Sequence, residues 1–361
     1  MGRARSLGTL TAALAALALA ACWAAGCGTP DERTRRDLEE VGRATFGAVA
    51  VAIDQGTVLV ADPVASLVRF RANAPAVTVT LASGDTVARD VTVEVVNVAE
   101  DCVASTGSPS VIGHNTLSVA LAVPPGGTTS VTLAPPAGTL PRRARFAWVG
   151  DVHARIASLA RVLEAVDADA SLEFVVFGGD VTDEGTSDEL ERFVLAADQL
   201  ARPWYALIGN HDLKHDGGRE FQRLIGRTNV VFDVGGTRLV LLDSASATID
   251  GRVYDLLDEA LRTAPPLAIV GMHVPPFDPD GWRNTGFASR LEGARLAARL
   301  ADGGADLLIC GHLHELARDS VAGVPVVVSG NGGMAADGLH YVAVTADAGA
   351  ARVEAEPVWV P

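Results

Sequence analysis

The sequence predicts an α/β protein in two folded parts, a small all-β sandwich followed by a larger layered α/β domain. The 361 residues suffice for two domains of about 100–200 residues each. Apolar residues alternate with polar ones over 44–138, whereas strand-like and helix-like patterns follow one another over 144–361. With 48% hydrophobic and 20% charged residues, the composition is that of a globular chain.

The N-terminus has the pattern of an export signal. Arg3 and Arg5 precede an apolar run over residues 7–21, as in a secretory signal peptide. The run ends in Leu-Ala-Ala-Cys at 19–22, which resembles a bacterial lipobox, so we expect residues 1–21 to be removed and Cys22 to be lipidated. Cys27 is a second candidate, and an uncleaved membrane helix is an alternative because about 20 apolar residues can span a bilayer.

Each of these alternatives exports the rest of the chain, and we expect a lipoprotein of the cell envelope, at the outer membrane or in the periplasm. Residues 22–43, which are highly charged over 31–43, are expected to form a tether or a short helix. A net charge of −15 disfavours stable binding to nucleic acid. The four cysteines define no disulfide framework, although a Cys27–Cys102 bridge stays open.

Residues 44–138 have the period-two pattern of strands with one buried face. Val77, Val79 and Leu81, for example, alternate with threonines, and turn residues such as those at 83–85 and 124–127 fill the gaps. This spacing predicts a small β-sandwich, with an immunoglobulin-like fold as one option. His114 is expected to be a solvated loop residue.

A Pro/Gly-containing linker over 135–141 leads into the second domain, where strands and helices alternate. Strands are predicted at 145–149, 174–177, 204–208, 239–242, 267–270, 307–310 and 324–328. Helices are predicted near 156–166, 188–200, 254–261 and 290–300.

Five short motifs follow predicted strands, and they hold five of the eight histidines. Open α/β sheets place their sites at the carboxyl ends of strands. Carboxylate, amide and imidazole donors suit manganese, iron or zinc rather than a soft thiolate site. So many ligands indicate two ions that share a bridging carboxylate. The motifs are Asp151-Val-His153, Gly179-Asp180-Val-Thr-Asp183, Gly209-Asn210-His211-Asp212, His273 and Gly311-His312-Leu-His314.

In this order, the motifs resemble those of the calcineurin-like metallophosphoesterases, over about residues 144–361. The resemblance implies a four-layer sandwich, with two central β-sheets flanked by helices. It also implies two divalent or trivalent ions. The first would be held by Asp151, His153 and His314, the second by Asn210, His273 and His312, with Asp180 as the bridge.

The resemblance gives His211 the role of leaving-group acid or charge stabiliser, oriented by Asp183. Asp212 is expected to be a loop hydrogen-bonder, and His215 and His340 to be structural or exposed. The motif series is most similar to class III cyclic-nucleotide phosphodiesterases. Purple acid phosphatases also carry an N-terminal β-sandwich, but they have glycine in the place of His153 and tyrosine in the place of Asp183.

The implied activity is hydrolysis of a small phosphomonoester or phosphodiester by attack of a metal-bridging hydroxide. A cyclic-nucleotide phosphodiesterase is the more specific alternative, and a non-catalytic envelope binding protein is an alternative of another class. Residues 274–289 follow His273 and could line the substrate pocket, with Trp282 stacking on a base and Arg283 pairing with phosphate. An ordinary surface loop is the other interpretation of this segment.

Overall fold

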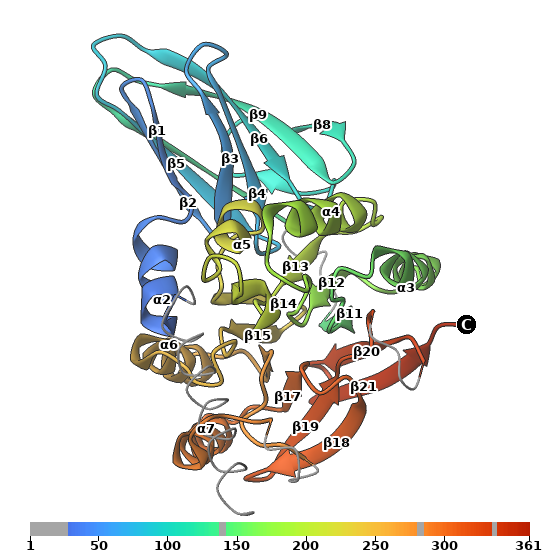
Figure 1. The fold of residues 1–361 in the computed structure, drawn as a ribbon. Coiled ribbons are helices and arrows are strands. Elements are labelled where there is room, and N and C mark those ends of the chain that lie inside the picture. Colours follow the sequence, from blue (N-terminus) through green and yellow to red (C-terminus); the bar gives the residue numbers. More distant parts are fainter. Residues whose placement is uncertain (1–27, 137–141, 280–284, 334–337) are drawn as a thin grey trace, which may run out of the picture.

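The protein consists of a β-sandwich that stands on a larger α/β domain (Figure 1). The structure is a computed structural model, and it describes residues 28–136, 142–279, 285–333 and 338–361. The lipobox, Trp282 and Arg283 lie outside these ranges. The fold is of the predicted class, a β-sandwich followed by a layered α/β domain.

The N-terminal sandwich has two five-stranded sheets that enclose one apolar core. One sheet has the order β1 (Arg43–Phe46), β2 (Val49–Asp54), β5 (Val77–Ser83), β10 (Thr128–Ala134) and β7 (Val103–Ala104). The other has the order β3 (Gly56–Asp62), β4 (Leu67–Ala72), β6 (Arg89–Val96), β9 (Thr116–Val123) and β8 (Ser110–Gly113). Strands β4 and β6 pair in parallel, which departs from the antiparallel sheets of an immunoglobulin domain.

The α/β domain is built on two further sheets. The first has the order β13 (Trp204–Ala206), β12 (Phe174–Phe177), β11 (Arg143–Val149), β20 (His340–Asp347) and β21 (Arg352–Trp359). The second has the order β14 (Val230–Val234), β15 (Thr237–Leu242), β16 (Leu267–Met272), β17 (Leu307–Cys310), β19 (Val324–Ser329) and β18 (Leu316–Val321). Within each sheet the central strands run parallel, so their carboxyl ends share an edge.

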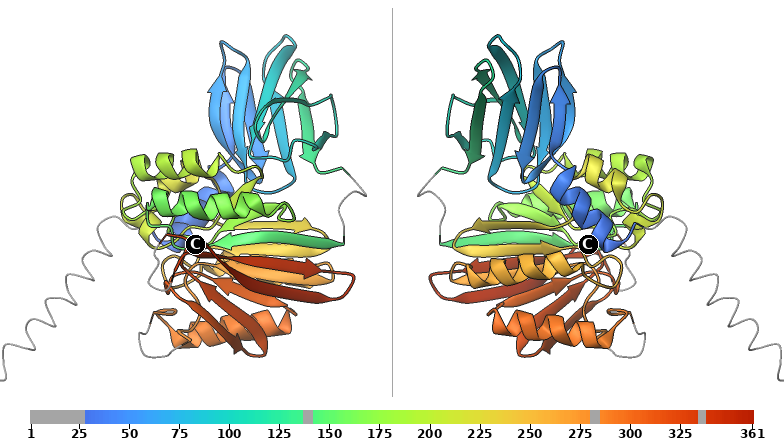
Figure 2. Two further views of the ribbon diagram at one scale, coloured as in Figure 1. Left: turned by 90° about the vertical axis from the view of Figure 1, so that its right-hand side faces the viewer. Right: turned by 90° about the vertical axis from the view of Figure 1, so that its left-hand side faces the viewer.

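These sheets and their helices form four layers, which Figure 2 shows from the side. Phe146 and Trp148 of β11 point into the core between the sheets, where they meet residues such as Leu239. Val149 points the other way, into the core under α3 (Ile156–Ala168) and α4 (Ser187–Ala197). A third core lies under α6 (Gly251–Arg262) and α7 (Arg290–Asp302). Burial on both faces explains why the central strands are continuous apolar runs.

Residues before the sandwich form helix α2 (Pro30–Glu39), which packs against the α/β domain. Arg33 is fully buried and forms an ion pair with Asp243 at 2.6 Å. Asp37 accepts hydrogen bonds from the backbone N–H groups of Thr228 and Asn229. The charged segment is therefore a docked helix over Pro30–Glu39, and not a free tether there.

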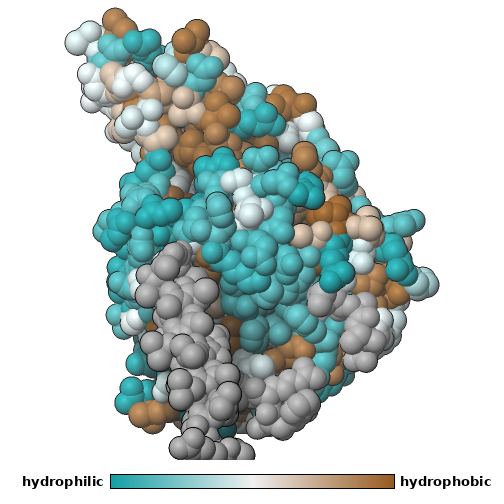
Figure 3. All heavy atoms as spheres, viewed as in Figure 1, coloured by the Kyte–Doolittle hydropathy of each residue, from teal (hydrophilic) through white to brown (hydrophobic). Residues whose placement is uncertain are grey.

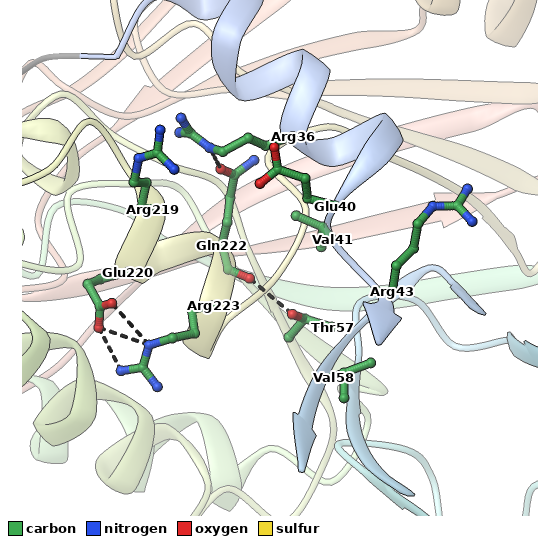
Figure 4. Close-up of a pocket in the computed structure, with 11 residues that line it drawn as sticks. Arg36, Glu40, Val41, Arg43, Thr57, Val58, Arg219, Glu220, Gln222 and Arg223 are labelled. Atoms are coloured by element: carbon green, nitrogen blue, oxygen red, sulfur yellow. Dashed lines mark hydrogen bonds and ion pairs between the residues drawn. The ribbon is translucent and has the colours of Figure 1, made fainter. Parts of the chain in front are cut away.

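Helix α2 meets β3 and α5 (Arg219–Leu224) at a junction shown in Figure 4. Arg36 Nε donates to Gln222 Oε1 at 2.6 Å, and the Thr57 hydroxyl donates to the Gln222 carbonyl at 3.1 Å. A cavity of about 300 Å³ opens beside these contacts. Helix α2 and the sandwich thus both contact Gln222 of α5.

The sandwich also contacts the α/β domain directly. The Asn97 side chain accepts from Trp204 N at 2.8 Å and donates to the Trp204 carbonyl, and Arg71 forms a bidentate ion pair with Asp198. His114, expected to be a solvated loop residue, lies in a turn with its side chain exposed, and its ring contacts the Leu200 carbonyl. The exposed turn position agrees with the prediction, and the contact with Leu200 adds a link to the α/β domain.

Apolar side chains at the surface gather on the sandwich, as the upper part of Figure 3 shows. They include Val64, Val87, Val111 and Ile112. Within the described ranges, no helix combines the length and the apolar character that crossing a bilayer requires.

Candidate metal centre

The predicted ligands lie together at one edge of the α/β domain, on loops that follow five parallel strands. Asp151 and His153 follow β11, while Asp180 and Asp183 follow β12. Asn210 and His211 lie in the segment that follows β13. The second sheet contributes His273 after β16 and both His312 and His314 after β17.

Several of these residues have a left-handed backbone, which is uncommon outside glycine. The φ angles are 55° at Asp151, 51° at Asp180 and 76° at His312. Such conformations cost on the order of 1–3 kcal/mol each and cluster at functional sites. The preceding Gly179 also has positive φ, and a Cβ there would lie 2.5 Å from His273 Nδ1. The strained backbone at Asp151, Asp180 and His312 and the close packing at Gly179 therefore serve to position donor atoms, and not to stabilise the fold.

The first group of donor atoms comes from Asp151, His153, Asp180 and His314, with all four atoms within 4.8 Å of one another. The Nε2 atoms of His153 and His314 are 2.9 Å apart. His314 Nε2 lies 3.3 Å from Asp151 Oδ1. These separations are those of donors around one small ion, such as zinc with bonds of about 2.0–2.2 Å.

The second group contains Asp180, His273 and His312. His273 Nε2 is 3.2 Å from Asp180 Oδ2 and 3.1 Å from Asn210 Oδ1, which adds the amide to this group. The Nδ1 of His273 donates to the Gly178 carbonyl at 2.8 Å, which fixes the ring and leaves Nε2 for a metal. Asp180 belongs to both groups, as a bridging carboxylate must.

Two buried carboxylates make this centre electrostatically negative, which favours the binding of cations. Asp151 and Asp180 are 0% and 1% exposed. Burial opposes protonation of His273, but the charges of Asp180 and Asp151 outweigh it and raise its pKa to about 10. Burial and the neighbouring His273 lower the pKa of His312 to about 4. Donor types, separations and charge all fit two bound cations.

Asp212 ties two of the ligand loops together. It is buried, and its carboxylate accepts hydrogen bonds from Thr182 N, the Thr182 hydroxyl and Gly209 N. Burial and the charge of Asp180 raise the pKa of Asp212 to about 6. The expected role as a loop hydrogen-bonder is confirmed.

His211 stands beside the metal ligands, with its ring centroid 4.4 Å from that of His153. Its Nδ1 lies 2.8 Å from the backbone carbonyl of Asp183 and 3.2 Å from the Asp183 carboxylate. Lys214 Nζ is also 2.8 Å from this Nδ1. The sequence analysis did not single out Lys214. One signal was available there, since Lys214 is the only lysine in the chain.

Other singled-out residues lie away from the centre. His215 is exposed, and buried His340 contacts the Ser329 hydroxyl, as expected of structural or exposed residues. The cavity beside α2 (Figure 4) shares no lining residue with either donor group. The candidate metal site is therefore the cluster of predicted ligands, and not this cavity.

Comparisons with known proteins agree with this site. The family model described as calcineurin-like phosphoesterase matches residues 144–316. The chain is 31% identical over 189 residues to a Rhodococcus erythropolis protein named probable cyclic nucleotide phosphodiesterase, covering 47% of this chain and 61% of that protein. It is 33% identical over 92 residues to a probable glycerophosphodiester phosphodiesterase of Arcobacter nitrofigilis, covering 24% and 33% of the two chains. The matches thus span less than two thirds of either relative.

A solved purple acid phosphatase from yellow lupin seeds has a similar fold, with a TM-score of 0.52. The two are 13% identical, and the likeness covers 79% of this chain and 72% of that one. At this identity it shows the fold alone.

The four-layer fold and the paired donor groups define a domain of the metallophosphoesterase class. The family match agrees with this class, because the model described as calcineurin-like phosphoesterase matches residues 144–316, the segment that carries the motifs.

Proposed function

We propose that this protein is a metal-dependent phosphoesterase that hydrolyses a small phosphomonoester or phosphodiester. The observation that carries the proposal is that both donor groups are complete and share Asp180. A non-catalytic binding protein would need none of this strained, buried arrangement.

The position of each predicted ligand indicates which ion it would hold. Asp151, His153 and His314 would hold one ion, Asn210, His273 and His312 the other, and Asp180 both. Two ions held there would neutralise charge on the phosphoryl oxygens and activate the attacking water. Because Asp183 and Lys214 engage Nδ1 of His211, its Nε2 is the ring nitrogen that would give a proton to the leaving oxygen.

A second candidate is a cyclic-nucleotide phosphodiesterase. The motif series and the match to the Rhodococcus erythropolis protein, which carries that name, favour it. The match to a protein named for glycerophosphodiesters supports phosphodiesters more generally.

The test is an assay of purified protein with manganese across chromogenic monoesters, chromogenic diesters and cyclic nucleotides. Turnover of one class, lost with a chelator and restored by metal, supports the proposal. If no class is hydrolysed with manganese, iron or zinc, the proposal fails. Preference for 3′,5′-cyclic nucleotides over linear diesters would select the second candidate.

We further propose that the protein is exported and lipidated at Cys22, so that it is held at an envelope membrane. The basic and apolar N-terminal residues and the lipobox support this, as does Trp23 in place of the aspartate that retains enterobacterial lipoproteins at the inner membrane. The substrate would then be a small phosphate ester outside the cytoplasm.

A further inference from the structure

One basic residue near the metal centre stands apart from all others in the chain. The sequence contains 29 lysine and arginine residues, and Lys214 is the only lysine. It lies three residues after His211, at the end of the short 3-10 turn His211–Leu213. The arginine-rich chain thus places its one lysine beside the residue that would protonate the leaving group.

The ammonium group of Lys214 is held by three neighbours. Nζ donates to the Asp183 carbonyl at 2.8 Å and lies 2.8 Å from His211 Nδ1. It also lies 3.2 Å from Glu184 Oε1. Each neighbour belongs to, or directly follows, the Gly-Asp and Gly-Asn-His motifs, so Nζ lies beside the loops that carry the metal ligands.

Burial decreases in order from the metal ligands to Lys214. The side chain of Asp180 is 1% exposed, that of His211 25% and that of Lys214 37%. A phosphoryl group between the two donor groups would therefore have the rest of its ester directed outwards, past His211. Lys214 lies on the Nδ1 side of the His211 ring, and its side chain is more exposed than that of His211.

A lysine side chain can readily exchange one anionic partner for another. The ammonium is a compact charge on a flexible stem, whereas arginine holds a carboxylate in a rigid planar fork. Glu184, the present partner, is 62% exposed, and exposed ion pairs are weak because water and salt screen them. An anionic group on a bound substrate could replace Glu184 and form a charge-assisted hydrogen bond.

We propose that Lys214 is a specificity-determining residue that selects phosphate esters whose alcohol or phenol part carries a second anionic group, such as a carboxylate or a further phosphate. The proposal rests on the phosphoesterase function proposed above. It adds the substrate class, since neither the motifs nor the comparisons assign a role to Lys214.

Three aryl esters test it, in whichever ester class the metal-loaded wild type hydrolyses. Their phenols are 3-(carboxymethyl)phenol, 3-ethylphenol and 3-(trimethylammoniomethyl)phenol, in which the methylene group insulates the ring from the charge. The wild type should show a KM about 10-fold lower for the anionic ester than for the neutral one, the size expected of a charge-assisted bond. Lys214→Met should remove this preference, and Lys214→Arg should keep part of it.

Two controls separate specificity from other effects. Arg192→Met removes one positive charge from exposed helix α4 and should leave the preference intact. Glu184→Gln removes the competing carboxylate and should lower the KM for the anionic ester. If Lys214→Met instead lowers kcat equally on all three esters, Lys214 only positions His211 and the inference is overturned. If the wild type hydrolyses none of the three, the inference about Lys214 fails, whereas the phosphoesterase proposal is decided by the assay across monoesters, diesters and cyclic nucleotides.

Chemical labelling gives a readout that does not need turnover. An amine-directed acylating reagent can modify only Lys214 and the chain's N-terminal amine, because there is no other lysine. Phenylphosphonate that carries a carboxymethyl group should slow acylation of Lys214 in the metal-loaded protein, as measured by peptide mass spectrometry. Equal protection by the neutral phosphonate would contradict an anion contact.

Discussion

Asp180 binds the loop that carries His211 through one carboxylate oxygen and faces the metal ligands through the other. Its Oδ1 accepts a hydrogen bond from the backbone N–H of His211 at 2.7 Å. Its Oδ2 lies 3.2 Å from His273 Nε2 and 3.6 Å from His153 Nε2. One side chain therefore couples both donor groups to the acid–base residue.

Asp180→Asn should weaken binding of both ions and abolish turnover. The amide can keep the hydrogen bond to His211 through its oxygen, but it cannot supply a second anionic oxygen between the groups. Metal content after dialysis, measured by atomic emission, checks this. Asp188→Asn on exposed helix α4 is the matched control. Two ions retained at unchanged affinity in the Asp180 variant would contradict the bridging role.

His211→Ala should keep both ions and lower turnover by about 10²–10⁴-fold, the usual contribution of a general acid. The loss should be smaller on p-nitrophenyl esters than on alkyl esters, because a good leaving group needs less protonation. Steady-state rates on the two ester types measure this difference. An equal loss on both would show that His211 does not protonate the leaving group.

Arg33→Met should lower the free energy of unfolding by about 3–5 kcal/mol, because it leaves Asp243 buried without its cation. Urea unfolding followed by circular dichroism gives the value. Arg33→Met with Asp243→Leu should recover much of the loss, since no buried charge is then left.

The control for this pair is Arg35→Met, on the exposed face of the same helix. It removes the same charge and should leave the unfolding midpoint nearly unchanged. If Arg33→Met behaves like Arg35→Met, helix α2 is not an integral part of the α/β domain.

Mature protein from a bacterial host should begin at lipidated Cys22. Intact-mass and N-terminal peptide mass spectrometry test this directly, and an unmodified start or a start at Cys27 would refute it. The Cys22→Ala, Cys27→Ala double variant should be released in soluble form. Its metal-dependent turnover should persist, because every predicted ligand lies beyond residue 144.

The strands that carry ligands could be predicted closely from the sequence. Strand β12 (Phe174–Phe177) and strand β17 (Leu307–Cys310) have the predicted bounds, because both are short apolar runs that stop at a Gly-Asp or Gly-His motif. The motifs themselves pointed to the side chains that the structure brings together in the two donor groups, since their identity and order are local features.

Long-range contacts could not be predicted. Strands β20 and β21 were missed, and β20 pairs with β11 across about 200 residues, so its place depends on tertiary context. Docking of α2 depends on the Arg33–Asp243 pair, whose members are 210 residues apart. The charge-rich sequence of α2 predicts a solvated segment. Its burial becomes evident only when Asp243, the ion-pair partner of Arg33, is known.

The central claim is that two metal ions, bridged by Asp180, make this domain a phosphoesterase. Metal titration of metal-free protein tests this claim most directly. Manganese binding by calorimetry and hydrolysis of a chromogenic phosphate ester would be followed in the same samples. We predict two ions per chain, with turnover that appears only as the second site fills. Binding of one ion or none, or hydrolysis that is unchanged in metal-free protein, would contradict the account.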